Sequence, residues 1–285
     1  MQNSVKSSRA KRFGVRVAVV AGSAGTVLAL AAPMVSAQEA LPPIPGAAVC
    51  NDTVGAQVCL TVDVLNGAFD NNGFNLPIKA GDMIITSALG ETADGAVFTP
   101  RADGHNGLYA KPMTVPGGVL GIDLPFGNLF GLAGVTAEVK AVAAPSFNGN
   151  LMDFDISLPV KMKINNAFLG NNCYLGSETE PVNFRLKNAN PGEAPEFEPI
   201  DTAVKFLGIE NVAEDFAIPK ASGCGPFGVL NPIVNWRAKT PATAGTSLAT
   251  TSDAYIFTPG FEGSDPLEDL GGGTGSLGSS GSSGS

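Results

Sequence analysis

Cysteine and histidine are the residues in this chain that could carry out nucleophilic or metal chemistry, and there are few of them. The 285 residues include four cysteines, Cys50, Cys59, Cys173 and Cys224, and one histidine, His105. A thiol nucleophile needs a basic partner, and a structural zinc site needs two close pairs of cysteine or histidine ligands. The spacing offers neither arrangement. We therefore expect Cys173 to form a disulfide, and we predict a protein that uses no metal or other cofactor and is not an enzyme.

Other catalytic groupings are weakly represented. There is no G-x-S-x-G sequence, and a serine hydrolase would have to combine His105 with Asp103 in the turn-rich RADGHNG. Carboxylate pairs of the kind that glycoside hydrolases use do occur. Their positions, on the polar side of an alternating segment or in charge-rich segments, are typical of solvated side chains. The pairs are Asp153 with Asp155, Glu178 with Glu180, and Glu210 with Glu214. A hydrolase of undetected type remains the third alternative for function.

The first 37 residues predict export. Residues 1–16 contain five basic residues and no acidic one. An apolar run follows from Val17 to Ala32, and small residues stand at Val35 and Ala37. This is the pattern of a secretory signal peptide, residues 1–37, so the mature chain should begin at Gln38. We expect a secreted protein, extracellular or loosely associated with the cell wall, with no transmembrane anchor in the mature chain.

Charge limits the class of partner. The mature chain would keep 12 of the 17 basic residues and all 26 acidic ones, a formal charge of about −14. Such a surface repels nucleic-acid phosphates. We therefore expect no nucleic-acid partner, while a lipid or another component of the cell envelope remains open as a partner.

Glycine and proline punctuate the chain. There are 36 glycines and 21 prolines, which favours short strands between many turns. Residues 38–47 form a proline-rich lead-in, and residues 259–285 a flexible tail rich in glycine and serine. We expect residues 48–258 to form an all-β, antiparallel β-sandwich, either as one domain or as two β subdomains with a boundary near 145–155.

One segment shows the strand pattern clearly. DFDISLPVKMKIN, residues 153–165, alternates apolar and polar residues, which predicts a half-buried strand. Pro159 on its polar side indicates an edge or a bulge. Weaker alternation predicts strands over 57–67, 135–143, 182–186, 233–239 and 252–257. One helix is predicted over 200–216, where Val204, Leu207 and Ile209 could share a face.

The even number of cysteines, together with export, predicts two disulfides. Four cysteines allow three pairings. Cys50 and Cys59 lie nine residues apart with Gly55 between them, so they could face each other in a hairpin, and this pairing would leave Cys173 with Cys224.

The sequence around the last two cysteines resembles a known family. FLGNNCYLGS is followed by EDFAIPKASGCG and then by VLNPIVNW. This order is similar to that of secreted actinobacterial proteins of unknown function that carry a CYxG motif and a downstream GCG motif. The resemblance covers about 158–257, and its best markers are Cys173, Tyr174, Gly176, Gly223, Cys224 and Gly225. It implies secretion from a Gram-positive actinobacterium, a β-rich fold and a bond between Cys173 and Cys224, and it supplies no catalytic residue.

An apolar segment supports an alternative function. Among residues 112–137, Asp123 is the only acidic residue, and six glycines interrupt the sequence. It could be a buried strand with a glycine-rich loop, or it could line an apolar pocket or form an exposed patch that meets lipid. The residues concerned are Leu120, Ile122, Leu124, Phe126, Leu129, Phe130 and Leu132. We thus expect a secreted, non-catalytic structural or interaction protein of the envelope or the medium; the alternative is a binder of apolar small molecules or lipid through Leu120 to Leu132.

Overall fold

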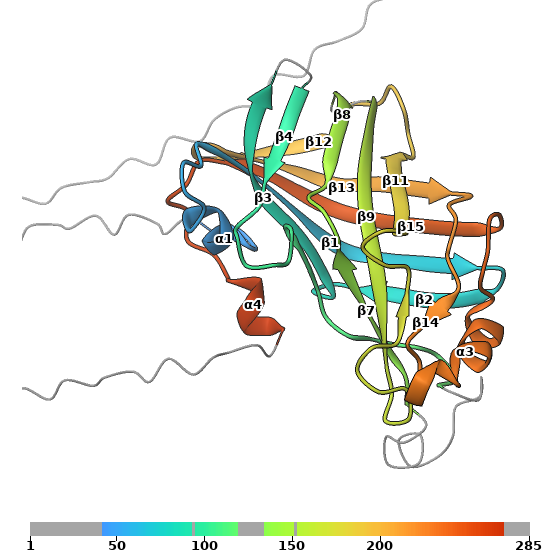
Figure 1. Ribbon diagram of the computed structural model, residues 1–285. Helices are drawn as coiled ribbons and strands as arrows, with labels where there is room; N and C mark the ends of the chain where they lie inside the picture. Colours follow the sequence, from blue (N-terminus) through green and yellow to red (C-terminus); the bar gives the residue numbers. More distant parts are fainter. Residues whose placement is uncertain (1–41, 93–94, 119–133, 151–152, 271–285) are drawn as a thin grey trace, which may run out of the picture. The chain divides into compact units, whose positions relative to one another are not determined.

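Antiparallel strands make up most of the fold (Figure 1). The computed structural model describes residues 42–92, 95–118, 134–150 and 153–270, all of which belong to one unit, Ala40–Ser285. The strands are β1 (Val58–Asn71), β2 (Phe74–Lys79), β3 (Met83–Thr92), β4 (Gly95–Thr99), β5 (Leu108–Ala110), β6 (Met113–Thr114), β7 (Thr136–Ala141), β8 (Ser146–Asn150), β9 (Asp153–Asn165), β10 (Tyr174–Leu175), β11 (Val182–Asn188), β12 (Glu196–Ile200), β13 (Ala203–Glu214), β14 (Ala221–Ser222) and β15 (Thr246–Phe257). The all-β prediction is confirmed.

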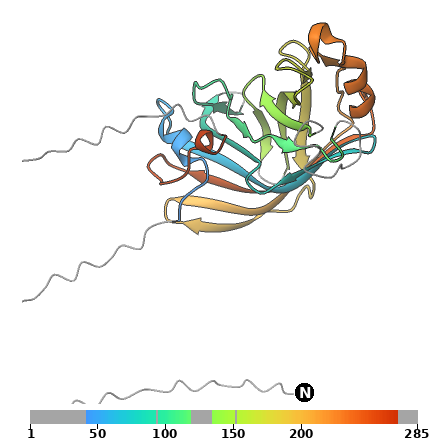
Figure 2. The ribbon, with the colours of Figure 1, turned by 90° about the horizontal axis from the view of Figure 1, so that it is seen from below.

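The helices are short and lie before the first strand, between β14 and β15, and after the last strand. They are α1 (Ala47–Asn51), the 3-10 turn η1 (Pro226–Gly228), α3 (Asn231–Ala238) and α4 (Pro266–Asp269). In Figures 1 and 2, α1 lies at one end of the long strands and α3 at the other. No helix in the described part of the chain is both long enough and apolar enough to cross a membrane.

Eight of the strands close into a barrel. Their hydrogen-bonded order is β11, β13, β15, β1, β3, β4, β8 and β9, and β9 pairs with β11 again, with Val182 opposite Val160 and Lys187 opposite Asp155. The expected sandwich is therefore wrong. Sandwiches and barrels both bury one face of each strand, so alternation along single strands predicts neither in preference to the other. The long-range pairing of β9 with β11 is what closes the sheet.

Strands from both halves of the chain share this barrel. β8 pairs with β9 from Ser146 opposite Ser157 to Asn150 opposite Asp153, and β1 pairs with β15 over almost its whole length. Ser146–Asn150 of β8 and Asp153–Ser157 of β9 are thus paired with each other in one barrel.

A second apolar cluster lies on the outer side of the barrel wall, beside α1. It joins residues before and after the strands, because Ile44 and Phe261 are buried in it together with Phe257. The Phe257 and Phe261 rings meet edge to face with their centroids 5.9 Å apart. The packed part of the protein therefore extends beyond 48–258 at both ends.

β9 follows the expected alternation. Leu158, Val160 and Met162 are buried in the main core, while the residues between them are more exposed. Pro159 lies where β9 changes partner, because Ser157 pairs with Ser146 of β8 and Val160 pairs with Ala141 of β7. A residue without an N–H group fits such a break in a hydrogen-bonded ladder. The irregularity is a change of partner, whereas the sequence indicated an edge or a bulge.

The helix predicted over 200–216 is wrong, because Ala203–Glu214 of this range form β13. A bulge explains the misleading pattern. Phe206 pairs with Ala254 and Ile209 with Ser252, so β13 advances three residues where β15 advances two. The Gly208 amide inside the bulge donates to Asp253 Oδ1 at 2.9 Å. One extra residue shifts the period of two, and apolar spacings of three then imitate a helix.

The strand predicted over 233–239 is also wrong, because most of it belongs to α3. Pro232 stands in the first turn, where a helix needs no N–H group from it. Val234 and Ala238, four residues apart, are the buried residues of this helix. A spacing of four residues is typical of one face of a helix. The short alternation of apolar and polar residues over 233–239 suggested a strand, but burial follows the helical spacing.

Candidate ligand-binding cavity

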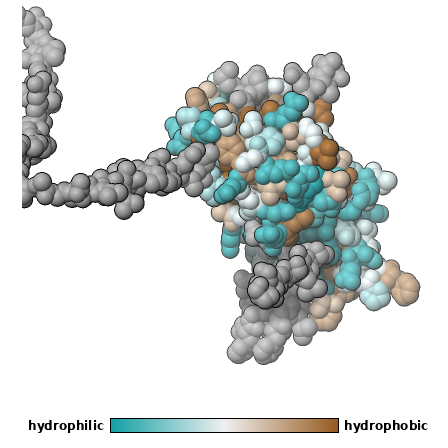
Figure 3. All heavy atoms as spheres, turned by 90° about the vertical axis from the view of Figure 1, so that its left-hand side faces the viewer, coloured by the Kyte–Doolittle hydropathy of each residue, from teal (hydrophilic) through white to brown (hydrophobic). Residues whose placement is uncertain are grey.

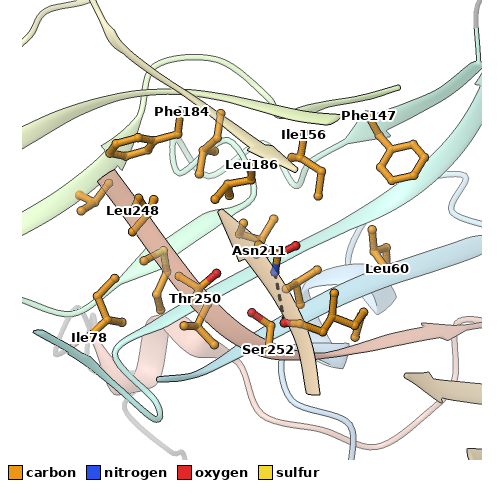
Figure 4. A pocket seen from close by; sticks show the side chains of 18 of the residues that line it. Leu60, Ile78, Phe147, Ile156, Phe184, Leu186, Asn211, Leu248, Thr250 and Ser252 are labelled. Carbon is orange, nitrogen blue, oxygen red and sulfur yellow. Dashed lines mark hydrogen bonds between the residues drawn. The ribbon is translucent and has the colours of Figure 1, made fainter. Parts of the chain in front are cut away.

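The barrel interior contains an apolar cavity of about 280 Å³ (Figure 4). Side chains from strands that are far apart in the sequence line it, and all but three of these side chains are apolar. The apolar ones are Leu60, Val62, Val64, Phe69, Leu76, Ile78, Met83, Ile85, Leu89, Phe98, Met113, Val139, Phe147, Ile156, Leu158, Met162, Phe184, Leu186, Ile209, Leu248, Ala254 and Ile256. An eight-stranded barrel has an interior just wide enough for side chains to fill or for one small ligand.

The strand alternation places these side chains. Every second residue of β15 from Leu248 to Ile256 lines the cavity, and so does every second residue of β1 from Leu60 to Val64. Small residues follow one another on the inner face of β15, since Thr250, Ser252 and Ala254 stand where larger side chains would fill the barrel. We attribute the open volume to these small side chains.

Three neutral polar side chains interrupt the apolar wall. Asn211 of β13 lies directly opposite Thr250 of β15, and Ser252 is the next inward residue of β15. Figure 4 shows the three side chains next to one another. Asn211 Nδ2 donates to the Ile209 carbonyl at 3.4 Å, which is longer than a typical N–H···O bond.

The hydroxyl of Ser252 is buried and has no partner among the residues that the structure describes. The residue is 1% exposed, and its Oγ makes no hydrogen bond to any of the described residues. Leaving a buried hydroxyl unpaired costs about 1–3 kcal/mol. The hydroxyl oxygen of Ser252 is thus a buried polar atom at the cavity wall, and no described residue forms a hydrogen bond with it.

Charged side chains stay on the other side of this wall. Asp63 and Asp253 face each other across β1 and β15 at positions that alternate with the cavity-lining residues. Lys205 Nζ lies 2.7 Å from Asp253 Oδ2. Burial, and then the charge of Asp253, raises the pKa of Asp63, whereas the hydrogen bond to Asp253 raises the pKa of Lys205. No charged residue is among the described residues that line the cavity.

Figure 3 shows a different composition on the outside. On this face, polar residues cover much of the described surface, and hydrophobic residues are scattered among them. The cavity wall is thus far more apolar than this face of the exterior.

All four cysteines are bonded. Cys50 pairs with Cys59 and Cys173 with Cys224, the expected pairs, and no free cysteine remains. Cys173 and Cys224 are fully buried in the main core. Cys173 is therefore a structural residue, as its sequence surroundings predicted.

The glycines of the GCG motif serve the same structure. Gly223 has a φ of +69°, and a Cβ there would lie 2.1 Å from the Asn172 carbonyl oxygen, next to Cys173. Gly225 has a φ of +71°, and its amide donates to the Leu169 carbonyl at 2.8 Å. Positive φ and close backbone approach both require glycine. The motif is explained by the packing around the disulfide.

The residues weighed for hydrolysis make structural contacts. Asp103 accepts hydrogen bonds from the Tyr109 hydroxyl at 2.6 Å, from Arg101 Nε at 2.9 Å and from the His105 amide at 2.9 Å. The His105 ring stacks on Tyr109, with centroids 5.1 Å apart. The carboxylate of Asp155 pairs with Arg185, and that of Glu178 with Lys161.

The apolar contact residues predicted between Leu120 and Leu132 lie outside the described residues. That group is Leu120, Ile122, Leu124, Phe126, Leu129, Phe130 and Leu132. Sequence reasoning missed Asn211, Thr250 and Ser252, because serine and threonine are ordinary residues on either face of a strand. The available signal was the run of small residues on one face of TSLATTSDAYIF.

Comparison of this chain with protein-family models, curated proteins and solved structures finds no match.

Proposed function

We propose that this protein is exported and binds one apolar small molecule inside the barrel, without catalysing a reaction on it. The observation that carries the proposal is the cavity of about 280 Å³ with an almost wholly apolar wall. Small-molecule pockets are typically apolar cavities of about 300–1,000 Å³ with a few polar groups. This cavity lies just below that range and has the same composition.

The energetics favour an apolar occupant. Apolar cavities of this kind tend to stay dry, and the side chains around an empty space lose dispersion contacts. A ligand that buries apolar surface gains about 25 cal/mol per Å². A small molecule with a hydrocarbon body would therefore be stabilised in the barrel.

Export is supported by the two disulfides. Disulfides form and persist mainly in oxidising compartments outside the cytosol. Together with the signal-peptide pattern of residues 1–37, this supports the proposal that binding takes place in the medium or at the cell wall.

A fluorescence titration tests the binding. N-phenyl-1-naphthylamine, an uncharged dye that brightens in apolar surroundings, is titrated into mature protein. Ala254 lines the cavity. Ala254→Leu should fill part of this space and weaken binding of the dye at least about tenfold. Ala249→Leu makes the same change at an exposed position of the same strand and should bind as the wild type does. A wild type that does not bind the dye, or equal binding by both variants, would refute the proposal.

An interaction protein is the second candidate, and one surface favours it. Phe227, Val229, Ile233 and Trp236 on and beside α3 are exposed, Trp236 at 71%. Clustered exposed apolar side chains often mark contact sites. If this role is correct, Trp236→Ser should reduce sedimentation of the protein with envelope fragments of its host, while Ala254→Leu should leave it unchanged. Equal sedimentation of wild type and Trp236→Ser would remove this candidate.

A further inference from the structure

The three polar residues of the cavity wall indicate what kind of ligand the barrel takes, if the proposed binding is correct. Asn211, Thr250 and Ser252 form one group on β13 and β15. Ser252 is the key member, since its hydroxyl is buried and has no partner among the described residues. Buried polar groups are nearly always hydrogen-bonded in native proteins, so this atom points to a missing partner.

The chemistry of the group allows both donation and acceptance. A hydroxyl has one donor and two acceptor sites, and a side-chain amide has two donors and an acceptor oxygen. Asn211, Thr250 and Ser252 could therefore hold either a hydroxyl or a carbonyl oxygen. The rest of the wall offers only apolar surface.

A charged head group does not fit this wall. No lysine, arginine or histidine lines the described part of the cavity. Lys205, on the far side of the wall, already pairs with Asp253, and Asp63 lies beside that pair. A carboxylate inside would be desolvated without a counter-charge, which is strongly unfavourable.

We propose that the natural ligand is a neutral amphiphile, with a hydrocarbon body in the barrel and one uncharged oxygen-bearing head group, such as an alcohol or an ester, hydrogen-bonded by Asn211, Thr250 and Ser252. The site selects against fatty-acid anions. This inference rests on the proposed function and narrows it to a ligand class.

A matched ligand series tests the selectivity. Decane, 1-decanol, methyl decanoate and decanoate compete at pH 8 for bound N-phenyl-1-naphthylamine. We expect decanol and the ester to bind about tenfold more tightly than decane, since one or two hydrogen bonds are gained, and decanoate to bind more weakly than both. Below the pKa of the free acid, decanoic acid should compete as the alcohol does.

Variants connect the selectivity to the three residues. The double variant Ser252→Ala and Thr250→Val removes both hydroxyls and leaves Asn211 as the polar residue of the group, so the affinity for decanol should fall severalfold toward that for decane, while decane still binds. It should fold, because it removes an unsatisfied polar atom. Thr251→Val, on the outward side of β15, is the control and should leave the series unchanged.

The outcomes separate the two proposals. If dye and decane bind, but decanoate at pH 8 competes as well as decanol, the head-group inference is wrong and the apolar-binding proposal stands. The same holds if the double variant keeps the full preference for decanol over decane, because the hydroxyls of Ser252 and Thr250 would then not bind the head group. If neither the dye nor any member of the series binds, both proposals fail.

Discussion

At the scale of single residues, Arg101 joins distant parts of the chain. Its guanidinium makes two hydrogen bonds to Asp265, at 2.9 and 3.1 Å, and one to Asp103 at 2.9 Å. It also reaches Asp52 at 3.2 Å. Such bidentate, charge-assisted contacts are among the stronger polar interactions in proteins. Arg101 thereby attaches the segment of α4 to the loop that follows β4.

The two aspartates respond to this arrangement. The hydrogen bond from Arg101 lowers the pKa of Asp265. Burial alone would raise the pKa of Asp103, but the hydrogen bonds from Tyr109, from the His105 amide and from Arg101 more than offset burial and lower it. Both carboxylates are therefore more acidic in the folded protein than in the unfolded chain.

Acid should weaken this contact. Groups whose pKa is lowered by folding stabilise the protein fully above the ordinary aspartate value of about 3.9, and this stabilisation is lost as the pH falls through the folded values. We expect Arg101→Gln to lower the free energy of unfolding by about 2–4 kcal/mol at pH 7. Urea unfolding measures this free energy, and the difference from the wild type should narrow as the pH falls below the ordinary aspartate value of about 3.9.

The control for this prediction is Lys140→Gln, which breaks the more exposed ion pair with Glu138. Such surface pairs contribute about 0–1 kcal/mol. If Arg101→Gln costs no more than Lys140→Gln at pH 7, the structural role given to Arg101 is wrong.

Gly223 offers a second prediction at this scale. Gly223→Ala places a Cβ 2.1 Å from the Asn172 carbonyl oxygen, whereas Gly192→Ala meets nothing within 4 Å although Gly192 also has a positive φ, +86°. The left-handed conformation alone costs about 1–2 kcal/mol, and crowding adds about 1–3 kcal/mol. Gly223→Ala should therefore be the more destabilising variant in urea unfolding. Equal losses would mean that the motif glycine is kept for its φ alone.

At the scale of elements, the Cys173–Cys224 disulfide supports a very short strand pair. Cys173 precedes β10 and Cys224 follows β14, and these strands pair through two residues each. So short a pairing is marginal by itself. β10 also pairs with β9, with Tyr174 opposite Lys163 and Leu175 opposite Met162. The disulfide therefore ties the β14 side to the barrel through β10.

Removing the disulfides should have unequal effects. The bonds close loops of 51 and 9 residues, for which loop entropy predicts about 4 and about 2.5 kcal/mol. The double variant Cys173→Ser and Cys224→Ser should thus lose more stability than Cys50→Ser and Cys59→Ser, as measured by urea unfolding without reductant. The reverse order would contradict the structural role of the motif, and a peptide map joining Cys59 to Cys173 would contradict the pairing itself.

At the scale of the whole molecule, local patterns predicted the class of fold but not its closure. The alternation of Leu158, Val160 and Met162 predicted β9, because this face of the strand is buried from Leu158 to Ile164. The bulge at Gly208 hid β13. Closure depends on the pairing of β9 with β11, a long-range contact that no local pattern encodes.

The cavity was beyond prediction for a similar reason. Ser252 and Asn211 are 41 positions apart in the sequence and meet only because β13 pairs with β15 in a particular register. That register includes a bulge, which sequence periodicity could not place. The cysteine pairs, in contrast, could be inferred because compartment, number and spacing limit them.

Native mass spectrometry of the mature protein, purified without detergent from its own host, tests the central claim of a barrel that holds an apolar molecule most directly. We predict one bound, uncharged compound per chain, which is released on unfolding and is absent from Ala254→Leu but present in Ala249→Leu. A wild-type protein that carries no compound, and that takes up none of the decane series when it is offered, would contradict the account.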